Sequence, residues 1–265
     1  MALDKITKLG RYFLALPMVV FGIQHFLYAE FIVNLVPAWI PGGLFWTYFA
    51  GVALFASGLG IIINVLSRLA AMLLGLMISI WVIILHIPRV FQFPGDTEFI
   101  NVFDAVCILS GAYLLSRSLP GPVPWKVLEK IAASAAKLSP YLIAVSLTVF
   151  GIENFIHNKL VFIVGAPPYE IPGGTFWVYC TNVIFIGTAF SIFFSKRVGA
   201  ISALLGIYIF FIAAIFYVPL LWVNIYDAHA WATLLKGFAM TGSAFILSTE
   251  SSKEKTIMLQ ESVPV

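Results

Sequence analysis

The sequence FGIQHFLYAEFIVNLVPAWIPGGLFWTYFAGVALFASG occupies residues 21–58, and a related sequence, FGIENFIHNKLVFIVGAPPYEIPGGTFWVYCTNVIFIG, occupies residues 150–187. The opening Phe-Gly-Ile triplets align at an offset of 129 residues. After a two-residue insertion, the Ile-Pro-Gly-Gly and Phe-Trp-x-Tyr motifs align at an offset of 131, as do Gly75 with Gly206 and Gly111 with Gly242. Matches that continue over this length indicate that the chain is a tandem duplication.

The composition predicts that both copies lie in a membrane. Hydrophobic residues make up 61% of the chain and charged residues 10%, and the mean hydropathy is +1.01. Soluble chains average about 45–50% apolar and about 25% charged residues. Water does not solvate a surface of this composition, so we expect an all-α integral membrane protein. Cys107 and Cys180 lie far apart without a C-x-x-C motif, which indicates neither a dithiol centre nor a cysteine metal site.

Eight apolar runs are long enough to cross a bilayer as helices, which takes roughly 20 residues each. They lie at 11–28, 44–64, 69–88 and 100–116 in the first copy and at 140–157, 174–194, 198–219 and 230–248 in the second. We therefore predict two four-helix bundles, 1–116 and 140–248. Residues 117–139 are expected to form a linker with a short surface helix. Residues 249–265 are expected to form a polar tail without regular structure.

The distribution of Lys and Arg predicts how the chain is oriented. The termini and the loops after the second, fourth and sixth runs carry twelve of these residues, and the other side carries three. We expect both termini in the cytoplasm of a bacterium, with the chain crossing the cytoplasmic (inner) membrane. An even number of spans in each copy makes the two copies parallel repeats. Both Pro-Gly-Gly turns then lie on the outer side, within interfacial or re-entrant segments at 29–43 and 158–174.

Polar residues gather at the outer end of the first copy. Charged groups within a bilayer are costly, so they usually face the bundle interior, pair, or line a pathway. We expect a polar pocket formed by His25, Glu30, His86, Arg89 and Asp104. A neutral imidazole in this pocket could hydrogen-bond a quinone carbonyl or transfer a proton. The alternative is that the histidines lie at the interface, where water or backbone satisfies them.

The second copy keeps the turns and the small packing residues but changes the polar set. Asn154 replaces His25 and Tyr217 replaces His86 at equivalent positions. The candidate ligand-binding residues of this copy are Glu153, Asn154, His157, Tyr217 and Lys236. Either one copy holds a site and the other is scaffold, or the two copies complete a single site.

Several kinds of site lack their sequence signals. Histidines on facing helices can hold haem, but no H-x-x-x-H or E-x-x-H spacing occurs, so we expect neither haem nor a metal centre. The chain carries no Walker loop and no dinucleotide-binding glycine motif. Nothing in the sequence indicates binding to nucleic acid.

Residues 12–116 resemble the DoxX family of bacterial membrane proteins. The resemblance lies in F-G-I-Q-H-F, V-P-A-W-I-P-G-G, H-I-P-R-V and G-A-Y-L-L, and the second copy repeats the pattern in F-G-I-E-N-F and E-I-P-G-G-T-F-W. The resemblance implies a four-helix membrane bundle. It also implies kinship with redox-associated membrane proteins, including the small membrane subunit of thiosulfate:quinone oxidoreductase.

Three functions follow from these patterns. The first is a redox-associated subunit that contacts quinone at its outer face and works with a membrane or periplasmic redox partner. The second is a small-solute transporter, because parallel repeats are a known transporter plan. The third is a non-catalytic scaffold or assembly factor that holds a partner protein.

Overall fold

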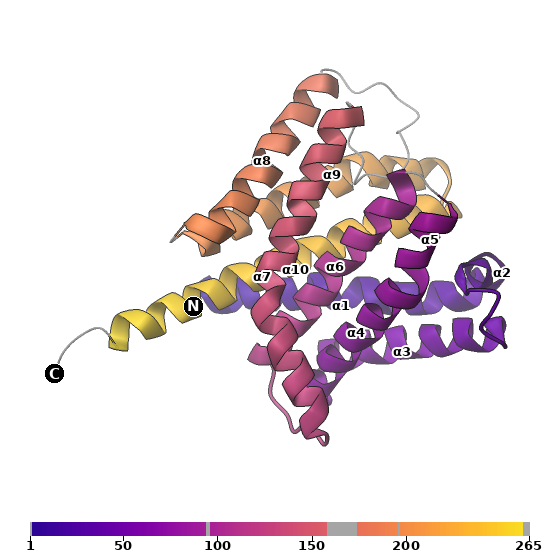
Figure 1. The fold of residues 1–265 in the computed structure, drawn as a ribbon, viewed down its shortest axis with the longest axis horizontal. Helices are drawn as coiled ribbons and strands as arrows, with labels where there is room; N and C mark the ends of the chain where they lie inside the picture. The colour runs from indigo at the N-terminus through magenta and orange to yellow at the C-terminus, as the bar shows by residue number, and fades with distance from the viewer. Residues whose placement is uncertain (1, 94–95, 158–173, 196, 262–265) are drawn as a thin grey trace.

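The computed structural model describes residues 2–93, 96–157, 174–195 and 197–261, and over these ranges the chain is helical with no strand. The long helices are α1 (Ala2–Leu27), α3 (Gly43–Ile63), α4 (Ser67–Trp81), α6 (Asp96–Ser118), α7 (Lys126–His157), α8 (Gly174–Phe194), α9 (Val198–Val223) and α10 (Ala228–Glu261) (Figure 1). Short elements connect them: α2 (Ala29–Ile32), the 3₁₀ helix η1 (Val33–Leu35), the π-helical η2 (Val82–His86) and α5 (Ile87–Gln92).

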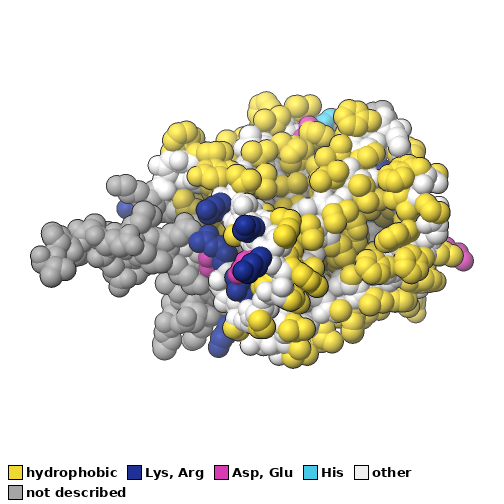
Figure 2. All heavy atoms as spheres, turned by 60° about the horizontal axis from the view of Figure 1, so that its bottom comes forward, with side chains coloured by type: hydrophobic (Ala, Val, Ile, Leu, Met, Phe, Trp, Pro, Cys, Tyr) yellow, Lys and Arg dark blue, Asp and Glu magenta, His cyan; other side chains and the backbone are white. Residues whose placement is uncertain are grey.

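The lengths of these helices fit a multi-pass membrane protein. Within the described ranges, seven helices are long and apolar enough to cross a bilayer, and the bent pair Lys8–Leu27 with Ala29–Leu35 makes up to eight. The expectation of an all-α membrane protein is therefore confirmed. In Figure 2 most of the visible face is apolar, and Lys and Arg side chains gather near one end. An apolar belt with charges near an end is the surface that a bilayer requires.

The two ends of the bundle differ. We call the end near the first residue of α1 and the last residue of α10 the terminal end, and the opposite end, which carries α2 and α5, the far end (Figure 1). At the far end the chain turns by 93° between α1 and the α2–η1 segment. Gly42 precedes α3 with φ of 77°, a left-handed conformation in which a side chain is strained. The second Pro-Gly-Gly segment lies outside the described residues.

Two segments differ from the sequence expectation. Residues 126–139 belong to α7, which runs without interruption to His157, so they do not form a separate surface helix. The chain continues through Pro140, because a proline within a membrane helix is tolerated where neighbouring groups compensate for the lost hydrogen bond. The tail expected to lack regular structure is also helical, because α10 extends to Glu261.

Helices of the two sequence copies pack against one another. α1 packs on α3 and on α10, while α7 packs on α8 and on α6. The two fourth helices, α6 and α10, also meet directly. Their close approach requires Gly111 of α6, where an added Cβ would lie 2.7 Å from the Cβ of Ser243 in α10. The interface between α6 and α10 therefore joins the first copy to the second.

Two pairs of small residues, Ala71 with Gly75 and Ser202 with Gly206, also lie at helix contacts. Ala71 and Ser202 are fully buried. An added Cβ at Gly75 would meet the ring of Tyr113, and one at Gly206 would meet the ring of Phe245. Small residues here let an aromatic ring of the next helix pack against the backbone, as expected for membrane helices.

Candidate functional site

A buried ion pair lies between α6 and α10. The Nζ atom of Lys236 is 2.6 Å from Oδ2 of Asp104 and 3.0 Å from Oδ1 of Asn101. Asp104 is 2% exposed, and the side chain of Lys236 is 19% exposed. Each residue lies eight positions after the first residue of its helix, which is about 12 Å along the axis at 1.5 Å per residue. The pair is thus inside the bundle, on the far-end side.

The carboxylate of Asp104 is only partly compensated. Lys236 pairs with Oδ2, while Oδ1 is buried and has no hydrogen-bond partner among the described residues. Removing two charges from water costs several kcal/mol per ion, and good geometry with further hydrogen bonds is needed to offset this cost. An ionisable residue within the membrane that lacks full compensation is a functional-site candidate by default.

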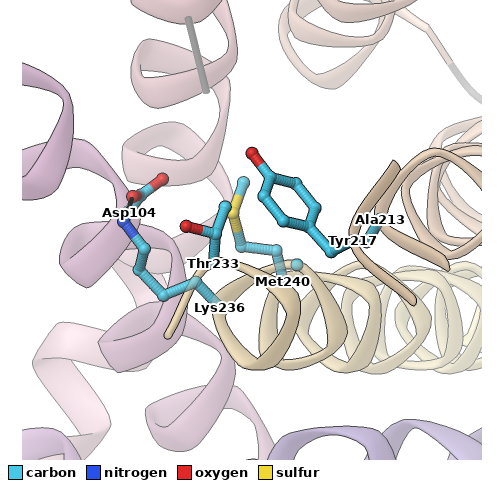
Figure 3. A pocket seen from close by; sticks show the side chains of 7 residues that line it. Asp104, Ala213, Tyr217, Thr233, Lys236 and Met240 are labelled. Atoms are coloured by element: carbon cyan, nitrogen blue, oxygen red, sulfur yellow. Dashed lines mark hydrogen bonds and ion pairs between the residues drawn. The ribbon is translucent and has the colours of Figure 1, made fainter. Parts of the chain in front are cut away.

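A narrow cleft runs beside the ion pair. Residues from α6, α9 and α10 line it, namely Asp104, Ala213, Tyr217, Thr233, Lys236, Gly237 and Met240. The Lys236 side chain points towards Asp104, with the hydroxyl of Thr233 nearby (Figure 3). The cleft holds about 230 Å³ of unfilled space, counting the part open to the outside, and no water-sized space remains within it. In this conformation the cleft is closed around its side chains.

A second ion pair lies at the far end. Arg89 of α5 donates from Nη2 to Oε1 of Glu98 at 2.7 Å and from Nε to Oε2 at 3.2 Å. The same guanidinium reaches the carbonyl of Asn34 within η1 at 3.5 Å and lies over the ring of Phe93 at 5.0 Å. Arg89 therefore holds α5, α6 and the bent α2–η1 segment together.

Polar residues lie between the two ion pairs. Asn101 stands one helical turn after Glu98 on α6, and its Oδ1 atom accepts a hydrogen bond from Lys236. His86 lies in the π-helical segment, where its ring interacts electrostatically with the charged groups of Lys236, Glu98 and Arg89. Its Nδ1 atom is buried and has no hydrogen-bond partner within the ranges that the structure describes. π-Helical turns in membrane and soluble helices are frequent at functional sites.

The other first-copy candidates lie elsewhere on the far end. The Nδ1 atom of His25 is 2.8 Å from the carbonyl of Phe21, and its ring stacks on Trp81 of α4 with 6.4 Å between centroids. Glu30 is exposed on α2, where its carbonyl accepts a hydrogen bond from Asn34 at 2.9 Å. The five candidates of the first copy therefore lie in three places. His25 lies where α1 contacts α4, and Glu30 lies on the surface of α2. His86, Arg89 and Asp104 lie on η2, α5 and α6.

The candidate residues of the second copy lie in two places, at the cleft and on α7. Lys236 and Tyr217 line the cleft together with Asp104, so residues of α6, α9 and α10 come together there. Glu153 and His157 pair with each other along α7 at 3.2 Å, and Asn154 on the same helix is fully buried.

Three polar residues at or beside the cleft were not among the sequence candidates: Glu98, Asn101 and Thr233. Residues 98, 101 and 104 are spaced three apart on one helix, so their side chains lie on one face. That spacing is a signal that could have identified Glu98 and Asn101 from Asp104. Thr233 stands three residues before Lys236. A single threonine at this spacing is common in helices, so the sequence contains no signal that would identify it.

No group of three or more metal-ligating side chains occurs in the part of the chain that the structure describes. Comparisons of the chain with models of protein families, with curated proteins and with solved structures found no match.

Proposed function

We propose that the chain is a redox-associated membrane protein of the DoxX-like type that binds the ring of a quinone at the cleft between α6, α9 and α10. The observation that carries the proposal is the buried Asp104–Lys236 pair beside this cleft. The ammonium of Lys236 has three hydrogens. It donates one to Asp104 and one to Asn101. The third can be donated to a carbonyl oxygen of the quinone.

Other lining residues suit the same ligand. The hydroxyl of Thr233 donates to the carbonyl of His229 at 3.0 Å, so its oxygen offers an acceptor to the hydroxyl of a reduced quinone. Ala213, Gly237 and Met240 give the cleft apolar walls for the flat ring. The ring enters when the side chains of Tyr217 and Met240 move apart, because the cleft is closed around them.

The distribution of Lys and Arg supports a definite orientation of the cleft in the membrane. With both termini in the cytoplasm of a bacterial cell, the far end faces outwards. The cleft then lies in the outer part of the inner membrane, where a membrane or periplasmic electron donor can approach it. The electrons come from that partner, and the chain itself positions the ring and supplies hydrogen bonds.

Titration with a tail-less quinone tests the proposal. The protein is purified in mild detergent, and binding is followed by the change in tryptophan fluorescence. Lys236→Met should weaken binding about tenfold or more, since a hydrogen bond from a charged group contributes about 1.5–3 kcal/mol. Lys130→Met is the matched control, because Lys130 is exposed in α7 at the terminal end. Equal affinity of the wild type and Lys236→Met contradicts the proposal.

A proton-coupled transporter is the second candidate. The observation that favours it is that the ion pair joins α6 and α10, the last spans of the two sequence copies. Transporters built from repeats place their sites between the repeats, and buried carboxylates relay protons in them. A flux assay in proteoliposomes with an imposed proton gradient distinguishes the two functions. Solute uptake that Asp104→Asn abolishes would favour transport.

A further inference from the structure

Three lysines lie along one side of the first half of α7. Lys126, Lys130 and Lys137 are exposed, and their spacing places them within about 40° of one another around the helix axis. The acidic residue beside them, Glu129, pairs with Arg68 of α4 at 2.7 Å, so its charge is already compensated. Within the ranges that the structure describes, none of the three lysines forms an ion pair. We call these three residues the lysine stripe, and it presents positive charge that the described part of the chain does not neutralise.

Beyond the lysine stripe, α7 presents an apolar face. Large apolar side chains are exposed at intervals from Leu138 to Ile156. This stretch is about 27 Å long, which is close to the roughly 30 Å of a hydrocarbon core. With 32 residues, α7 exceeds the core by about twelve residues, and these extend at the end that carries the lysines. The lysine stripe therefore lies in the head-group layer, a depth that also suits the exposed Trp125 directly before α7.

The charged and apolar parts of this surface adjoin on one side of the helix. Tyr141 and Val145 stand four and eight residues after Lys137, so the three side chains follow one another along the same face. Tyr141 is 50% exposed and Val145 is 47% exposed. Figure 2 shows that basic side chains border the apolar surface on the visible face of the molecule. A ligand that fits this part of α7 carries a negative charge at the depth of the head groups and a hydrocarbon chain below it.

We propose that this surface of α7 is a binding site for an anionic phospholipid of the leaflet at the terminal end. The phosphate lies on the lysine stripe, and one acyl chain lies along Tyr141 and Val145. Each lysine near a membrane surface adds to the attraction of an anionic lipid. An acidic peptide or a free phosphate would pair with the lysines but would leave the apolar face at membrane depth uncovered. The proposal does not depend on the quinone site, because the cleft lies between α6, α9 and α10.

Native mass spectrometry on the detergent-solubilised protein tests the proposal, because it counts the lipids that stay bound during a titration. The two lipids compared are phosphatidylglycerol, which is anionic, and phosphatidylcholine with the same acyl chains, which is zwitterionic. The wild type should bind phosphatidylglycerol more tightly, and added salt should reduce this preference. Lys130→Gln with Lys137→Gln should weaken binding of phosphatidylglycerol about tenfold or more and leave binding of phosphatidylcholine unchanged. Equal affinity of the wild type for the two lipids contradicts the proposal.

Lys8→Gln with Arg197→Gln is the matched control, because it also removes two exposed positive charges at the terminal end but none from the lysine stripe. The control should bind phosphatidylglycerol as the wild type does. Equal affinity of the two double variants overturns the proposal, since net charge alone would then set the affinity. Displacement of the lipid by an equal concentration of glycerol phosphate also overturns it, since the site would then take the head group without a chain. So does an acidic protein that co-purifies with the wild type and is lost from the lysine-stripe variant, with no change in lipid binding.

Discussion

Asp104 and Lys236 lie 132 residues apart in the sequence, and their side chains form an ion pair of 2.6 Å inside the bundle. At the repeat offset of 131, Lys236 stands one residue past the equivalent of Asp104. The pair therefore joins α6 to α10, and each helix contributes one charge to it.

The first prediction concerns the stability that this pair provides. Lys236→Met keeps the apolar stem but leaves the Asp104 carboxylate buried without its counter-charge. Breaking a buried pair in this way costs about 3–5 kcal/mol, so the thermal unfolding midpoint in detergent should fall markedly. The double variant Asp104→Asn with Lys236→Met removes both charges and should recover most of the loss. A double variant no more stable than Lys236→Met would show that the ion pair is not what the single change disrupts.

The second prediction concerns the approach of α6 to α10. Gly111→Ala should destabilise the protein by about 1–3 kcal/mol, because the new methyl group overlaps Ser243 in a packed interface. Gly187→Ala is the matched control, since Gly187 lies in α8 with no atom within 4 Å of an added Cβ. The control should be neutral or slightly stabilising, by about 0.5–1 kcal/mol, because alanine favours helix over glycine. Unfolding in denaturant compares the two, and equal stability would rule out close packing at Gly111.

The third prediction concerns Arg89. Lysine cannot reproduce the two parallel hydrogen bonds that Arg89 makes to Glu98, nor its reach to Asn34. Arg89→Lys should therefore speed amide hydrogen exchange in η1, which Arg89 links to α5 and α6. Arg197→Lys, an exposed change before α9, should leave this exchange unaltered. Unchanged exchange in η1 for both variants would mean that Arg89 does not hold the segment.

The fourth prediction concerns orientation. His229 is exposed at the far end of α10, and Lys130 is exposed at the terminal end of α7. In a background with Cys180→Ser, a membrane-impermeant thiol reagent should label His229→Cys in intact cells. Lys130→Cys should be labelled only after the membrane is permeabilised. The reverse pattern would place the termini outside the cell.

Much of the fold follows from the sequence because a bilayer leaves few choices. Each apolar run of about 20 residues must be helical to satisfy its backbone, and the structure has a helix at each of the eight positions. The boundaries are harder to predict. Residues 117–139 were expected to form a linker, yet α7 runs from Lys126 through Pro140 without a break, because the neighbouring packing of a membrane helix compensates for a proline.

The site was harder to predict than the fold. The spacing of residues along a helix shows which side chains share a face, and this relation connects Asp104 to Asn101 and Glu98. It does not show which helices of the two copies meet. His25 and Asp104 were expected in one pocket, but α1 packs mainly on α3 and α10, while α6 packs on α4, α7 and α10. Only the three-dimensional arrangement of the helices identifies Lys236 as the partner of Asp104.

The quinone assignment is tested by identifying the small molecules that co-purify with the protein from native membranes. The wild type and the neutral double variant, Asp104→Asn with Lys236→Met, are extracted in the same mild detergent, and bound compounds are quantified by mass spectrometry. If quinone binds at the Asp104–Lys236 cleft, it should co-purify in a stoichiometric amount with the wild type and be lost from a folded double variant. Equal amounts of quinone with both proteins, or none with either, would contradict the assignment of the Asp104–Lys236 cleft as a quinone site.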